Sequence, residues 1–79
     1  MEKEFNKVDA KIIGADGNVF NLIAICQRAL RKNGYNKEAK EMQERIYKCK
    51  NYDEALNIMM DYVNPISVND EINDSYGFE

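Results

Sequence analysis

The sequence contains no histidine among its 79 residues. This absence removes the commonest general base, any serine–histidine or cysteine–histidine nucleophile pair, and the usual ligand of zinc and iron. An enzyme built from this chain would depend on carboxylate, lysine, tyrosine or cysteine side chains alone. We therefore expect a protein that is not an enzyme and that holds neither a metal nor a cofactor.

Cysteine is scarce as well, since Cys26 and Cys49 are the only two. Their spacing matches neither a CxxC pair nor a metal-binding set. Each falls at an apolar position of an expected helix. We predict two buried free thiols rather than a disulfide.

Long apolar runs are missing. No stretch approaches the roughly 18 apolar residues that cross a membrane, and residues 1–4 lack the basic and apolar blocks of a signal peptide. We expect a cytoplasmic protein without membrane contact. A chain of 79 residues is sufficient for one small domain, whose stability is marginal or depends on self-association.

Basic residues are absent after Lys50. From Asn51 onward the chain has seven acidic residues and no basic one, whereas the stretch 28–50 has eight basic and three acidic residues. Such asymmetry bears on partners and orientation rather than on fold. The acidic segment is either a solvated tail or lies against the basic stretch, within one chain or between two. It lacks the residue order of a calcium loop.

The dominant feature that is present is an apolar stretch between Asp16 and Gly34. Its apolar residues cover more than half of a helical surface, so other elements must pack on at least two sides of this helix. Asp16 or Asn18 is expected to cap its N-terminus, and Gly34 suits the position after its C-terminus. We predict a central helix from about residue 19 to residue 33.

The stretch 7–13 precedes this helix and alternates in polarity. Val8, Ala10 and Ile12 share one face, which is the period of a half-buried strand. A single strand leaves its backbone groups unpaired and needs a neighbour. The candidates are the segment 66–68, the N-terminal residues, and the same strand in a second chain.

Two further helices are expected. Asn36 is the predicted cap of a surface helix over about 37–48, with a buried seam of Ala39, Met42, Ile46 and Cys49. Asn51 and Glu54 have capping-box spacing and open a third helix that runs to about Val63, where Asn64-Pro65 stops it. The buried face of that helix is expected to hold Tyr52, Ala55, Leu56, Met59 and Val63.

We therefore predict a small single α+β domain with one short N-terminal strand followed by three helices, the first of them central. Residues 1–6 are expected to be flexible, residues 7–64 to form the domain, and residues 65–79 to form an acidic, mostly disordered tail.

The sequence Ile12-Ile13-Gly14-Ala15-Asp16-Gly17-Asn18-Val19-Phe20, followed by Arg28-Ala29-Leu30-Arg31, Tyr52-Asp53 and Tyr62-Val63, resembles a group of small uncharacterised bacterial and phage-borne proteins. The resemblance covers about residues 8–63. It implies a strand, a Gly-Asp-Gly-Asn turn, a helical body and a mobile-element setting, but no mechanism. The acidic tail after Pro65 departs from that pattern.

Two candidate sites concern anions. The first is a basic patch that combines cations with an aromatic ring, as nucleic-acid backbones and bases require: Arg28, Arg31, Lys32, Tyr35 and Lys37. We favour the interpretation that these are ordinary surface cations without a binding role, because cations stabilise a helix C-terminus. The sequence pI near 4.9 is also far below that of a typical nucleic-acid-binding domain. The second is the turn at Gly17 and Asn18, where a helix N-terminus attracts anions. Asp16 places a negative charge there, so a structural turn is the better interpretation.

A third candidate is an apolar interface on the third helix. Ile58 or Met60 is expected to face outward if Leu56 and Met59 face inward, because they lie on different sides of that helix. We predict a non-enzymatic protein–protein interaction module, with a homodimer as one form and phage or mobile-element origin as its setting. The alternative is a nucleic-acid or nucleotide binder that uses the basic patch.

Overall fold

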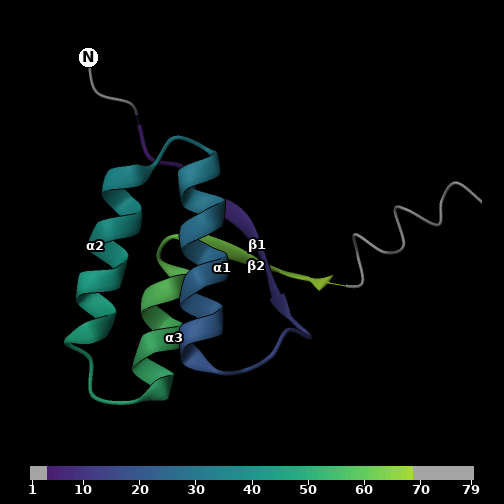
Figure 1. Ribbon diagram of the computed structural model, residues 1–79. Helices are drawn as coiled ribbons and strands as arrows, with labels where there is room; N and C mark the ends of the chain where they lie inside the picture. The colour runs from purple at the N-terminus through teal and green to yellow at the C-terminus, as the bar shows by residue number, and fades with distance from the viewer. Residues whose placement is uncertain (1–3, 69–79) are drawn as a thin grey trace, which may run out of the picture.

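A computed structural model describes residues 4–68, and within that range the protein is a mixed α+β domain (Figure 1). The elements follow in the order β1 (Val8–Ile13), α1 (Val19–Lys32), α2 (Asn36–Tyr47), α3 (Tyr52–Met60) and β2 (Val63–Ser67). The predicted fold class, with one N-terminal strand followed by three helices, is confirmed. The second strand is an addition that the sequence interpretation did not include as an element.

The two strands pair in parallel, with Val8 opposite Val63 and Ile13 opposite Ser67. Of the candidate partners for β1, the chain uses the segment around Ile66. Val8 donates its N–H to the Tyr62 carbonyl at 3.3 Å. Backbone groups of successive residues in a strand point to opposite edges, so the nitrogen of Pro65, which carries no hydrogen, faces away from β1. Proline is tolerated at such a position because no hydrogen bond to the neighbouring strand is lost.

The first helix is central, as predicted: α1 contacts α2, α3 and β1. Asn18 caps it by accepting the N–H of Phe20 at 2.8 Å. At the other end Gly34 has φ +87°, while Gly34 and Tyr35 donate their N–H groups to the carbonyls of Arg31 and Leu30. This Schellman turn leads directly into α2, so Tyr35 rather than Asn36 holds the capping position and no side chain caps α2.

The third helix ends at Met60, earlier than predicted. The N–H groups of Asp61 and Tyr62 still donate back to helix carbonyls, but Val63 already belongs to β2 and is 1% exposed. Pro65 restricts only Asn64, so the earlier stop follows from the pairing of Val63 with Val8 in the parallel sheet. The prediction that α3 extends to Val63 was therefore wrong.

The start of α3 is a variant of the predicted capping box. The Asn51 side chain accepts the N–H of Glu54 at 2.9 Å, and the Glu54 carboxylate accepts the N–H of Lys50 at 2.9 Å. In a standard box the return bond would go to Asn51 itself. One donor in the first turn of the helix, the N–H of Glu54, and one just ahead of it, the N–H of Lys50, are satisfied in this way.

Residues before β1 take part in the packing. The ring of Phe5 meets those of Tyr35 and Tyr62 edge-on, with centroids 4.8 and 5.8 Å apart. Phe5 thus packs on the core ahead of the predicted boundary at residue 7, and β2 carries the packed part past residue 64 to Ser67. Of the tail predicted over residues 65–79, residues 65–67 belong to β2, and residues 69–79 lie outside the described residues.

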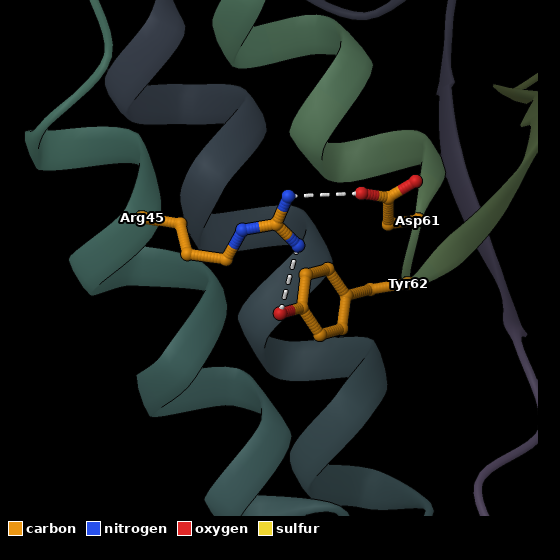
Figure 2. Close-up of polar contacts among 3 residues, drawn as sticks. All are labelled: Arg45, Asp61 and Tyr62. Atoms are coloured by element: carbon orange, nitrogen blue, oxygen red, sulfur yellow. Dashed lines mark hydrogen bonds and ion pairs between the residues drawn. The ribbon is translucent and has the colours of Figure 1, made fainter.

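A polar cluster of Arg45, Asp61 and Tyr62 connects α2 to the turn between α3 and β2 through hydrogen bonds (Figure 2). Arg45 donates to the Tyr62 hydroxyl at 3.2 Å and to the Asp61 carboxylate at 3.0 Å, and these two hydrogen bonds raise the pKa of Arg45. The Arg45 and Asp61 side chains are about half exposed. Solvent screens such a pair, so its role is to orient α2 on Tyr62 more than to stabilise the fold.

The two cysteines are free, as predicted, but only Cys26 is buried, so the predicted burial of Cys49 was wrong. Cys26 is fully buried in α1, and this burial raises the pKa of its thiol to about 11. Cys49 is only partly buried, since it lies in the connection between α2 and α3. One thiol therefore belongs to the core and the other to its margin.

Candidate functional site

A groove of about 890 Å³ lies between β1 and α1. Its first wall is residues 6–11, and its second is the C-terminal half of α1, which runs back alongside β1 (Figure 1). We call it the β1–α1 groove. The residues lining it are Asn6, Lys7, Val8, Asp9, Ala10, Lys11, Ile25, Arg28, Ala29, Lys32, Asn33, Tyr35 and Ile66.

The groove combines apolar and cationic parts. Val8 and Ala10 are buried, and Ile25 and Ala29 are half-buried and pack against the core. The cations that line it come from both walls: Lys7 and Lys11 from the strand side, Arg28 and Lys32 from the helix. Asp9 is an acidic member of the lining. The groove thus has an apolar component and an excess of positive charge.

One edge of β1 has no strand beside it among residues 4–68, where the sheet has two strands. The N–H of Val8 points to β2, as its bond to Tyr62 shows. Its neighbour Asp9 therefore directs its own N–H and C=O to the opposite edge, because backbone groups alternate along a strand. An extended chain placed there would meet a backbone donor and acceptor aligned for pairing.

The structure divides the predicted basic patch. Arg28 and Lys32 line the groove, whereas Arg31 and Lys37 are exposed and lie outside its lining. Lys7 and Lys11, which line the groove together with Arg28 and Lys32, were not part of the predicted patch. They could not be added from sequence spacing, because only the return of α1 alongside β1 brings the two groups together.

Tyr35 does not present its ring to solvent. It is 7% exposed, its hydroxyl donates to the Glu4 carbonyl at 3.4 Å, and the same hydroxyl accepts the N–H of Asn6 at 3.3 Å. Phe5 packs against its ring. The Tyr35 ring is therefore part of the core and is not placed to stack a nucleic-acid base, as the basic-patch hypothesis required.

The turn at Gly17 and Asn18 is occupied by its own contacts. The Asp16 carboxylate accepts the N–H of Asn18 at 3.1 Å, and the Asn18 side chain accepts that of Phe20. The Gly17 carbonyl accepts the hydroxyl of Tyr52 at 2.6 Å. Two donors that an anion would use are already bonded, which favours the structural interpretation of this turn over the anion site.

Ile58 and Met60 are both partly buried and pack against the core, so neither stands out on the surface. The short helix α3 lies against α1, α2 and β2, which covers more of its circumference than the sequence pattern predicted. The exposed aromatic residues are elsewhere. Phe20, Tyr47 and Tyr52 are 70%, 63% and 44% exposed and line a smaller hollow where three helix ends meet.

Sequence reasoning assigned Tyr52 to the buried face of α3 and Phe20 to the buried surface of α1. Core packing was the favoured interpretation of the tyrosines, so the exposed aromatic surface of Phe20, Tyr47 and Tyr52 was not predicted as a site. Its signal was weak, since a large apolar residue in an apolar helix normally points inward. Only the positions of the helix ends relative to one another leave these rings uncovered.

Two further findings concern residues 4–68. No three of their cysteine, aspartate or glutamate side chains come together in a way that could hold a metal ion. No helix formed by these residues has the length and apolar character to cross a membrane.

No family model, no curated protein and no solved structure matches the chain.

Proposed function

We propose that this protein is a non-enzymatic interaction module that binds an extended, acidic segment of a partner protein in the β1–α1 groove. The observation that carries the proposal is that β1, which has no strand on one edge among residues 4–68, also lines a groove whose lining includes four cations. An extended peptide would add a strand to β1, with backbone hydrogen bonds supplying affinity. Its alternate side chains would meet the lining residues of α1.

Charge selects the class of peptide. Lys7 and Lys11 from one wall and Arg28 and Lys32 from the other outnumber Asp9, so the field in the groove favours acidic side chains. Such charges act mainly on specificity and the rate of association, while the apolar lining contributes buried area. We expect the bound segment to alternate acidic and apolar residues.

Nucleic acid also carries negative charge, but the groove suits it less. A single strand would need exposed aromatic rings for its bases, and the aromatic side chain at this site, Tyr35, is buried. The pI near 4.9 also opposes binding to a polyanion outside this one groove. Binding of an oligonucleotide is therefore an outcome that the test below must be able to detect.

A homodimer stays a prediction, though pairing of two β1 edges is not its favoured form. That arrangement would bring the groove lysines and arginine of two copies together, and like charges repel. The solution mass by light scattering at two salt concentrations measures the oligomeric state directly. The cytoplasmic setting and the mobile-element origin also stay predictions from the sequence.

The test is a selection of random displayed peptides on the full chain, followed by titration of the synthesised winners by fluorescence anisotropy. We expect enriched sequences that are acidic and extended. Reversing the groove charges with Arg28→Glu and Lys32→Glu should weaken binding by about tenfold or more. The matched control is Arg31→Glu with Lys37→Glu, which makes the same charge change outside the groove and should alter binding by less than about threefold.

Equal losses in the two double variants would overturn the groove as the site, because they would show a response to net charge alone. Methylation of alternate backbone nitrogens in a winning peptide tests the strand addition separately. Methylation of the set of nitrogens that face β1 should abolish binding, because it removes the donors of the strand pairing. Methylation of the set that faces away should be tolerated. A twelve-nucleotide single strand that binds more tightly than any selected peptide would favour the nucleic-acid alternative.

A further inference from the structure

We propose that residues 69–79 of the same chain occupy the β1–α1 groove in the absence of a partner and thereby compete with it. The inference rests on the proposed function, because it assigns the regulation of that site. It makes the C-terminal segment an internal ligand. A partner would have to displace it before binding.

Charge complementarity is the first argument. The segment 69–79 contains four acidic residues, Asp70, Glu71, Asp74 and Glu79, and no basic residue. The groove presents cations from both of its walls. The segment also carries Ile72, Tyr76 and Phe78, apolar side chains of the kind that Ile25 and Ala29 can accept.

Reach is the second argument. The described chain ends beside Gly14, because a Cβ built on Gly14 would lie 3.2 Å from Val68. This point is the C-terminal end of β1, where Ser67 pairs with Ile13. A strand added to the open edge of β1 would lie about 10 Å from β2, two strand spacings away.

The remaining length is sufficient for that path. Residues 69–79 are eleven residues, which span about 36 Å when extended. About four of them cross from β2 to the open edge, and about seven remain to run back along β1. Because they start at the C-terminal end of β1, they would pair with it in the antiparallel sense, for which six strand residues are available.

The exposed aromatic surface is the competing destination for the same segment. It is formed by Phe20, Tyr47 and Tyr52, and Lys50 is the cation among its lining residues. The β1–α1 groove offers more positive charge and an open strand edge as well. We therefore assign the segment to the groove, and the test separates the two surfaces.

The experiment uses the full chain labelled with ¹⁵N and carrying a nitroxide at Ser75→Cys, in a Cys49→Ser background. Cys26 is fully buried and stays unlabelled under native conditions. We expect the nitroxide to reduce the amide signals of residues 6–11 and 28–33 to less than about half. Signals of residues 46–50 should keep their intensity. Replacing Asp70→Asn, Glu71→Gln and Asp74→Asn should restore the groove signals.

A mixture of ¹⁵N protein without a nitroxide and ¹⁴N protein with a nitroxide tests whether the contact is within one chain. Broadening in the mixture as strong as in the single species would mean that the segment enters a second copy, which overturns the proposal as stated. Broadening centred on residues 46–52 would assign the segment to the aromatic surface. If the nitroxide broadens no amide signal of the folded residues, the proposal is overturned.

The peptides selected on the groove separate this inference from the proposed function. If the segment competes, the tail-neutralised chain should bind them about three- to tenfold more tightly than the native chain, because its groove is free more of the time. Equal affinities, with the dependence on Arg28 and Lys32 retained, would reject the internal ligand and leave the proposed function standing. Peptides that bind neither chain would count against both.

Discussion

The hydroxyl of Tyr52 donates a hydrogen bond of 2.6 Å to the carbonyl of Gly17. The two residues lie 35 positions apart, one in the first turn of α3 and the other in the loop that leads into α1. The bond fixes the start of α3 against that loop. It also holds the ring of Tyr52 in the exposed aromatic surface, where 44% of the residue remains accessible.

Replacing Tyr52→Phe tests this tie. Loss of the hydroxyl should lower the free energy of unfolding by about 0.5–1 kcal/mol, the lower part of the usual range because the bond is accessible to water. Urea unfolding followed by circular dichroism measures it. The matched control is Tyr47→Phe, whose hydroxyl accepts from Gln43 on its own helix and joins no separate elements. A larger loss in the control would contradict the role given to Tyr52.

Two glycines of the same loop should respond differently to alanine. Gly14 has φ +89°, and a Cβ there would lie 3.2 Å from Val68, so Gly14→Ala is expected to destabilise the fold by about 1–3 kcal/mol. Gly17 lacks that constraint, and its added Cβ would lie 3.5 Å from the Tyr52 hydroxyl, an ordinary contact. Gly17→Ala should change stability by less than about 0.5 kcal/mol. Similar shifts in the two thermal midpoints would refute the assigned geometry.

The central position of α1 predicts a contrast between two of its apolar residues. Ile23 is 6% exposed and Phe20 is 70% exposed. Ile23→Asp buries an unpaired carboxylate and should unfold the domain, since the cost of several kcal/mol approaches its total stability. Phe20→Asp should leave a cooperative thermal transition. A cooperatively folded Ile23→Asp variant would show that the helix is placed wrongly.

The Cys26 thiol predicts a dependence on alkaline pH. Its pKa is about 11 in the folded protein against an ordinary value of 9.0. Between these values the unfolded chain loses the proton and the folded protein keeps it. The free energy of unfolding should therefore be unaffected below about pH 9 and fall by about 2–3 kcal/mol as pH rises to 11.

Chemical unfolding at several pH values between 8 and 11 measures this decline. Burial also raises the pKa of Tyr62, which adds to the fall in the same direction. Cys26→Ala should flatten part of the curve even though its cavity lowers stability at every pH. Cys49→Ala is the control and should keep the native slope. An unchanged slope in Cys26→Ala would contradict the protonated thiol.

The helices were predictable because their signals are local. Asn18, Gly34 and the pair Asn51–Glu54 mark helix ends through contacts with residues a few positions away, and the structure contains those contacts. The central place of α1 followed from the width of its apolar surface. These inferences needed no knowledge of distant parts of the chain.

The errors concern residues whose state depends on distant neighbours. Val63 was assigned to α3, but its pairing with Val8 makes it a strand residue. Tyr35 was grouped with the basic patch, yet Phe5 and Asn6 fold over it. The β1–α1 groove was not foreseen for the same reason, since its walls meet only when α1 returns alongside β1.

The parallel pairing of β1 with β2 also has a consequence for the order of folding. Val63 follows its partner Val8 by 55 positions, and all three described helices lie between them. At a synthesis rate of about 5–20 residues per second, β1 emerges roughly 3–11 seconds before the strand that completes its ladder. Closing so long a loop costs entropy before any pairing is gained. We expect the helices to assemble first and the sheet to form last, so the opening strand of the chain is the last element to find its neighbour.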